Sequence, residues 1–170
     1  NKLTLTGSGE TAPDGFLRRL TVDGRIADTT DNRVVLPGAA GASVGDGLIQ
    51  LAFGEAGRED WNGRIEVNGL TTGTFSAEKV SVILGGLAQN LNNAEARRIT
   101  FGVDGEVTGI TSERPEVATA LGDTISLDVN GSWAAGAPVT LTRAQITGNG
   151  LSVNAAGDIA DAAFNGTIRL

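Results

Sequence analysis

The sequence predicts an all-β protein built from one repetitive antiparallel sheet. Three observations support this fold class. Apolar and polar residues alternate in many short runs, Asp-Gly and Asn-Gly pairs recur along the whole length, and three segments of the second half resemble one another. Alternation with a period of two is typical of a strand that has one apolar face. The 170 residues are enough for a single domain with a substantial apolar surface.

The three similar segments begin at Ile99, Ile125 and Leu151, so they repeat every 26 residues (ITFGVDG, ISLDVNG and LSVNAAG). The first, third and fifth residues of each segment are apolar, the seventh is a glycine, and an apolar residue returns two positions later. We interpret the glycine as a turn and the returning apolar residue as the start of a second strand that doubles back. The repeat therefore predicts a sheet of successive hairpins.

Alternating runs elsewhere predict further strands, and the dipeptides between them predict the turns. Asp-Gly and Asn-Gly tolerate the positive φ angles of tight hairpin turns. Together these signals predict about a dozen short strands. Runs occur at 2–6, 20–22, 65–67, 80–82, 139–141 and 166–170, Asp-Gly pairs begin at 14, 23, 46 and 104, and Asn-Gly pairs begin at 62, 68, 130, 149 and 165.

One short helix is expected near residues 113–121. Ser112 is placed to cap it, Pro115 suits its first turn, and a glycine follows its last residue. A helix of so few turns is not stable alone. We expect it to pack Val117 and Leu121 against one end of the sheet, as a plug or corner.

The charge of the chain argues against a nucleic-acid partner. The net charge is −7, whereas phosphate binding requires clustered lysine and arginine. The only basic pairs are Arg18-Arg19 and Arg97-Arg98, and we interpret both as solvated strand or loop edges. Arg97 and Arg98 end a polar, asparagine-rich segment, 88–98, that predicts a loop.

The composition also argues against an enzyme. The chain has no histidine, cysteine or tyrosine, which excludes a Ser-His-Asp triad, a Cys-His pair and imidazole or thiolate metal ligands. Glu59 and Asp60 are the only adjacent acidic pair, and we interpret them as a solvated turn before Trp61. Trp133 falls in the apolar register of the repeat, which favours packing over ligand stacking. We expect no catalytic residues, no cofactor and no metal.

Segment 141–170 (LTRAQITGNGLSVNAAGDIADAAFNGTIRL) resembles the recurrent strand unit of TamB-like proteins, within the wider group of AsmA-like bridge proteins of Gram-negative bacteria. The preceding segment, from the expected helix through DTISLDVNGSWAAGAPVTLTRAQITGNG, resembles the same proteins. Before about residue 60 the resemblance rests on strand runs such as LTLTGSG and LRRLTVDGRIADTTDNRVVLPGA.

The resemblance implies a fold and a function. TamB-like proteins belong to a translocation and assembly module: an N-terminal helix anchors them in the inner membrane, they span the periplasm, and they reach an outer-membrane barrel of the TamA type. Their β-rich body forms a long trough, or β-taco, with an apolar inside. They are implicated in phospholipid transport between the membranes and in outer-membrane protein assembly. This chain would then be a periplasmic segment without the anchor.

The residues themselves are compatible with such a trough. If the sheet curls, the apolar residues of the repeat face its inside and line a groove for phospholipid acyl chains, whereas Thr100, Asp128 and Asn154 face solvent. The expected lining residues are Ile99, Phe101, Val103, Ile125, Leu127, Val129, Leu151 and Val153.

An alternative explains the same alternation. A structural β-sandwich or β-solenoid segment of a secreted or surface adhesin would cover the apolar stripe with a facing sheet, giving a closed core. Neither end of the sequence carries a polar cap, so we expect residues 1–170 to be one β-rich segment of a longer repetitive chain. Unpaired strands at 3–6 and 167–170 would then favour edge-to-edge association of copies.

Overall fold

A computed structural model of the chain describes residues 2–27, 33–36, 41–54, 58–160 and 163–170. The described residues form thirteen strands and one helix, α1 (Pro115–Leu121). Three of the strands have two residues each: β3 (Val34–Val35), β4 (Ser43–Val44) and β9 (Thr111–Ser112). The long strands are β1 (Lys2–Thr11), β2 (Leu17–Ala27), β5 (Asp46–Phe53), β6 (Asp60–Thr71), β7 (Phe75–Gln89), β8 (Arg98–Thr108), β10 (Thr124–Ala134), β11 (Val139–Thr147), β12 (Ser152–Ala160) and β13 (Ala163–Arg169).

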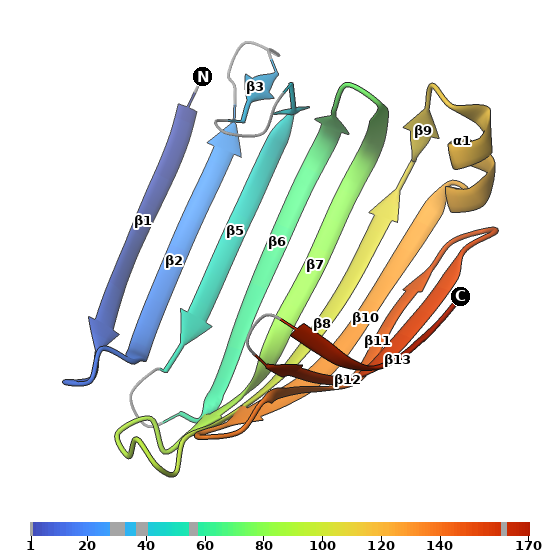
Figure 1. Cartoon of the computed structure of the whole chain (residues 1–170). Coiled ribbons are helices and arrows are strands. Elements are labelled where there is room, and N and C mark those ends of the chain that lie inside the picture. Colours follow the sequence, from blue (N-terminus) through green and yellow to red (C-terminus); the bar gives the residue numbers. More distant parts are fainter. Residues whose placement is uncertain (1, 28–32, 37–40, 55–57, 161–162) are drawn as a thin grey trace.

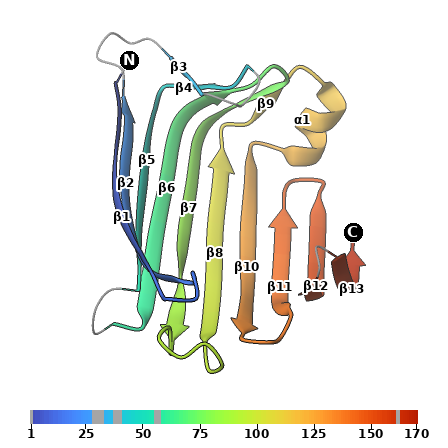
Figure 2. The ribbon, with the colours of Figure 1, turned by 60° about the vertical axis from the view of Figure 1, so that its left-hand side comes forward.

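All strands belong to one sheet, and every pairing in it is antiparallel. The long strands are ordered β1-β2-β5-β6-β7-β8-β10-β11-β12-β13, which follows their order in the sequence. The short strands β4 and β9 pair with β6 and β7 at one end of the sheet. Within the described residues β1 and β13 form two open edges, so the sheet does not close into a barrel (Figures 1 and 2). The predicted all-β antiparallel fold is confirmed.

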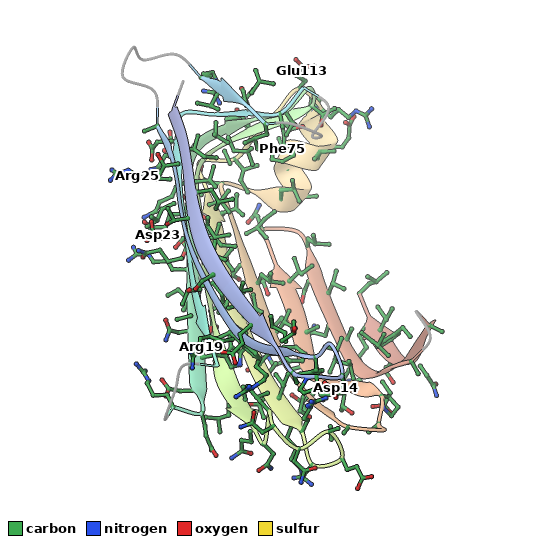
Figure 3. The ribbon with its side chains drawn as sticks, turned by 90° about the vertical axis from the view of Figure 1, so that its left-hand side faces the viewer. Asp14, Arg19, Asp23, Arg25, Phe75 and Glu113 are labelled. Atoms are coloured by element: carbon green, nitrogen blue, oxygen red, sulfur yellow. The ribbon has the colours of Figure 1, made fainter. Side chains whose placement is uncertain are left out.

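The sheet is curled into an open trough (Figure 3). In that view Asp23 and Arg25 of β2 point away from the concave side. Successive side chains of a strand point to opposite faces, so Val22 and Ile26 of β2 lie on the concave side. The interior of the trough is therefore apolar, as predicted.

The prediction that each Asp-Gly and Asn-Gly pair is a hairpin turn is wrong for most of them. Asp14-Gly15 and Asn149-Gly150 lie between strands, but the other seven pairs lie inside strands. Gly63 shows the reason. A Cβ atom there would lie 3.0 Å from the Cδ1 atoms of both Leu51 and Leu84 on the neighbouring strands. A glycine inside a strand gives the bulky side chains across from it room to approach.

Each repeated segment consequently lies within a single strand, and the chain does not double back at the glycine of the segment as expected. Strands β8, β10 and β12 each continue through that glycine. Strands β8 and β10 run in opposite directions, and their register pairs Val103 with Val129 and Phe101 with Gly131. Antiparallel pairing keeps the apolar residues of both strands on one face and places the glycine of one strand opposite a large residue of the other.

Helix α1 is present where it was expected, but Ser112 does not cap it. Arg114 is the N-cap residue, and Ser112 lies in β9, where its Oγ accepts a hydrogen bond from the Arg114 N–H (3.2 Å). At its other end the helix is attached to the β11–β12 turn, because the Leu121 carbonyl accepts a hydrogen bond from the Asn149 N–H (3.1 Å). The helix buries none of its residues, and Val117 is exposed. It is thus a corner, without the expected packing of Val117.

Few of the described side chains are buried. The buried apolar residues in this part of the chain are mostly alanines, and among its larger side chains only Val44 is almost completely enclosed. Because all described strands lie in one sheet, no second sheet formed by these residues covers the apolar face. The alternative of a sandwich with a closed core is wrong for the described residues.

Candidate functional site

One face of the sheet carries mainly apolar side chains over all ten long strands, and we call it the apolar face. The register of each strand pair fixes its membership, since residues directly opposite one another share a face. From the β1 side to the β13 side it includes Leu5, Val22, Ile26, Ile49, Leu51, Ile65, Val67, Val80, Val82, Leu84, Ile99, Phe101, Val103, Val107, Ile125, Leu127, Val129, Trp133, Leu141, Ala144, Ile146, Val153, Ala155, Ile159, Phe164 and Ile168.

The apolar face is accessible to solvent over most of its extent. Most of its side chains are half-buried, and Ile49 and Ile146 are each 38% exposed. Exposure increases at the two edges, to 65% for Leu5 on β1 and 59% for Ile168 on β13. Contiguous exposed apolar surface of this kind marks sites for ligands, membranes or partner proteins.

The opposite face is mainly polar, although Leu48 and the exposed Ile83 also lie on it, and hydrogen bonds between neighbouring strands cross it. The Gln50 amide donates to the Asp23 carboxylate (2.9 Å), and Arg143 forms an ion pair with Asp128 (3.4 Å). On β6, Arg64 forms an ion pair with Glu66, which lowers the pKa of the Glu66 carboxyl. Only one face of the sheet is therefore suited to bind an apolar ligand.

The register brings seven of the eight predicted lining residues together on the apolar face. The exception is Leu151, which precedes β12 and lies in the β11–β12 turn, where its carbonyl accepts a hydrogen bond from the Gly148 N–H (2.7 Å). That these residues hold acyl chains stays a prediction. Ile65, Val80 and Val82 lie on the same face, and the alternation in β6 and β7 alone does not indicate that their face continues into that of the repeat.

The turn between β1 and β2, residues Ala12–Phe16, lies over one end of the trough, and we call it the strap (Figures 2 and 3). Phe16 stacks on Trp133 at the end of β10, with ring centroids 5.5 Å apart and planes at 14°. Five inter-strand spacings separate β2 from β10, which would be roughly 24 Å in a flat sheet. The contact therefore depends on the curl of the sheet.

Arg97 holds the strap in place. Its guanidinium donates hydrogen bonds to both carboxylate oxygens of Asp14 (2.6 and 3.1 Å) and to the Leu91 carbonyl (3.0 Å), and it lies 4.3 Å from the centre of the Phe16 ring. The Arg97 side chain is 6% exposed, so the interpretation of Arg97 as a solvated loop residue is wrong, although Arg98 is exposed. No local signal distinguishes the two arginines.

Hydrogen bonding also changes the acidity of the strap carboxyl. The Arg97 guanidinium, and after it the Phe16 N–H, lower the pKa of Asp14 below its usual value.

The second tryptophan lies at the same end of the sheet, where Trp61 packs edge-on against Phe53 (6.1 Å) and its Nε1–H donates to the Thr100 carbonyl (3.0 Å). Both tryptophans thus contact a phenylalanine ring at the same end of the sheet.

Among the described residues there is no group of three or more Asp, Glu, His or Cys that could hold a metal ion. In the same part of the chain, no helix has the length and apolar character needed to cross a membrane.

Comparison of the chain with protein-family models, with curated proteins and with solved structures finds no match. The function is therefore inferred from the chemistry and shape of the apolar face.

Proposed function

We propose that this chain provides a hydrophobic groove for phospholipid acyl chains as they move between two membranes. The observation that carries the proposal is the half-exposed apolar face, which continues without interruption across ten strands of an open, curled sheet. A purely structural segment would have no need to leave so much apolar surface in contact with water.

The energetics match an acyl-chain ligand. Each CH₂ group of a lipid tail contributes about 0.8 kcal/mol when it leaves water, so a sixteen-carbon tail requires roughly 12 kcal/mol of shielding. Aliphatic side chains such as Val82, Leu84, Val103 and Leu127 supply that shielding without directional bonds. A tail held in this way slides along the face, and the charged headgroup remains in water at the open side of the trough.

The resemblance of segment 141–170 to the TamB-like strand unit supports a cellular setting for this activity. The chain would act in the periplasm, in a longer protein that bridges the inner and outer membranes and meets a barrel of the TamA type. A contribution to outer-membrane protein assembly belongs to the same proposal, because an open apolar face also suits unfolded strands.

Lipid capture by the purified chain tests the proposal. The chain is purified from bacterial cells without detergent, and bound lipid is identified by native mass spectrometry and by extraction. We expect co-purified phospholipid, and we expect Leu127→Asp to abolish it because the charge lies on the apolar face. The matched control is Ser126→Asp, which adds the same charge on the opposite face of the same strand and should leave lipid binding intact.

Circular dichroism of each variant separates loss of binding from loss of folding. Retained strand signal with lost lipid in Leu127→Asp supports the groove. A lipid-free wild-type mass, also after incubation with phospholipid vesicles, contradicts it, as does equal lipid binding by the two Asp variants.

A further inference from the structure

Arg97 is a buried cation at the margin of the apolar face. The Ala135 N–H donates a hydrogen bond to the Arg97 carbonyl (3.0 Å), which continues the β8–β10 ladder by one residue. Strand alternation then places the Arg97 side chain on the same side of the sheet as Ile99, which pairs with Trp133. The guanidinium and the indole therefore lie together on the apolar side, where β8 begins and β10 ends.

The strap presents to this place the two chemical groups of an anionic amphiphile. The Asp14 carboxylate accepts two hydrogen bonds from the Arg97 guanidinium (2.6 and 3.1 Å), and the Phe16 ring covers the Trp133 indole (5.5 Å). A phosphate offers a guanidinium the same pair of oxygen atoms, and arginine binds phosphates in the same forked geometry. A lipid tail would cover the indole as the phenylalanine ring does. The strap thus occupies a position that suits a phospholipid.

The strap is joined to β8 and β10 by side chains. Within the described part of the chain its backbone hydrogen bonds are internal: the Ala12 N–H donates to the Phe16 carbonyl (2.8 Å), and the Gly15 N–H donates to the Ala12 carbonyl (2.9 Å). The Asp14 side chain is 43% exposed, so water and solutes reach the carboxylate (Figure 3). The strap can therefore leave Arg97 without breaking a ladder of backbone hydrogen bonds.

Arg97 keeps its position when the strap leaves. Its Nε–H donates to the Leu91 carbonyl (3.0 Å), which does not belong to the strap. A guanidinium that loses its carboxylate beside an apolar surface favours another anion as partner. From Arg97 onward, β8 carries Ile99, Phe101 and Val103 on the apolar face, a path of about 20 Å for the tail of a lipid whose phosphate lies at Arg97.

We propose that the strap is a displaceable cover and that Arg97 beneath it binds the phosphate of a phospholipid whose tail lies along β8. This inference rests on the proposed function, because it requires an acyl chain on the apolar face. Elsewhere on the face the headgroup remains in water. At the strap end the phosphate replaces Asp14 and the tail replaces Phe16, so this end is selective for lipids that carry a phosphate.

Two amphiphiles with the same tail test the inference. Lysophosphatidic acid with a palmitoyl tail carries a phosphate, whereas monopalmitoylglycerol does not, and calorimetric titration measures the affinity of the chain for each. Asp14→Asn removes the competing carboxylate and should raise the affinity for lysophosphatidic acid about threefold or more, with a smaller gain for monopalmitoylglycerol. Arg97→Gln should lower the affinity for lysophosphatidic acid about tenfold or more. Both variants break the same ion pair, so a purely structural pair would change the affinity in one direction.

The controls separate this inference from the proposed function. Arg98→Gln, at the exposed neighbour, should leave both affinities unchanged, and circular dichroism checks the fold of each variant. If Arg97→Gln does not fold, the Asp14→Asn comparison decides by itself.

Three results would overturn the inference while the groove stands: the same change of affinity in Asp14→Asn and Arg97→Gln, an Asp14→Asn gain that is equal for the two amphiphiles, or equally tight binding of glycerol phosphate, which has no tail. Failure of the wild type and of every variant to bind either amphiphile would overturn the proposed function as well.

Discussion

Asp14 and Arg97 are 83 residues apart in the sequence, yet their side chains are joined by two hydrogen bonds of 2.6 and 3.1 Å. Asp14 lies in the strap between β1 and β2, and Arg97 directly precedes β8. The bonds therefore connect one wall of the trough to its centre. Phe16 of the same turn stacks on Trp133, so the strap covers this end of the apolar face.

Removal of the arginine should release the strap. In Arg97→Gln the guanidinium that bonds Asp14 and covers the Phe16 ring is lost, so Phe16 should leave Trp133. Tryptophan fluorescence in a Trp61→Phe background, where Trp133 is the only tryptophan, should shift to longer wavelength as the indole meets water. Arg98→Gln, at the exposed neighbour, is the control, and equal spectra for the two variants would contradict the role of Arg97.

The strap should also respond to acid. The Arg97 guanidinium lowers the pKa of Asp14 below its usual value of 3.8. The stabilisation of the strap by this ion pair is therefore present in full above pH 3.8. It is lost as the pH falls through the lower pKa of the folded state. We expect the Trp133 emission of the same background to stay constant down to about pH 4 and to shift below it. The transition should disappear in Asp14→Asn, and its persistence there would assign it to another carboxyl.

Phe16 should contribute to stability through its two ring contacts. An aromatic pair contributes about 0.5 to 1.5 kcal/mol beyond its buried area, and a cation above the ring adds about 0.5 kcal/mol or more. We expect Phe16→Ala to lower the free energy of unfolding in urea by roughly 2 kcal/mol. Phe75→Ala, at a ring that is 37% exposed, should lower the free energy of unfolding clearly less. Equal losses would show that the stack of Phe16 on Trp133 adds no stability.

The glycine inside β10 should not tolerate a side chain. A Cβ atom at Gly131 would lie 2.6 Å from the Thr140 carbonyl oxygen and would also collide with the Phe101 ring. Gly131→Ala should therefore cost about 1 to 3 kcal/mol of stability, measured by urea unfolding. The same change should be nearly neutral at Gly73, where a Cβ atom would have no neighbouring atom within 4 Å. A neutral Gly131→Ala would show that the strands can move apart.

Alternation allowed the fold class and most of the candidate site to be predicted. The pleat of a strand places every second side chain on one face, so the pattern around Ile99, Ile125 and Val153 specifies an apolar face whatever the rest of the chain does. The same local reasoning failed for Asn-Gly and Asp-Gly pairs, because it considers only the φ preference of the dipeptide. Gly63 and Gly131 are required by the size of residues on neighbouring strands, and the dipeptide carries no information about those neighbours.

The sequence by itself determined that this protein is an antiparallel sheet with one apolar and one polar face and without histidine or cysteine chemistry. Tertiary structure decided that the apolar face stays open, that Arg97 is buried while Arg98 is exposed, and that the strap reaches Trp133. The physical reason is the distance along the sequence over which each feature is determined. Face alternation is set by neighbouring residues along one strand, whereas curl, exposure and the contact between Asp14 and Arg97 arise only when strands distant in the sequence are assembled.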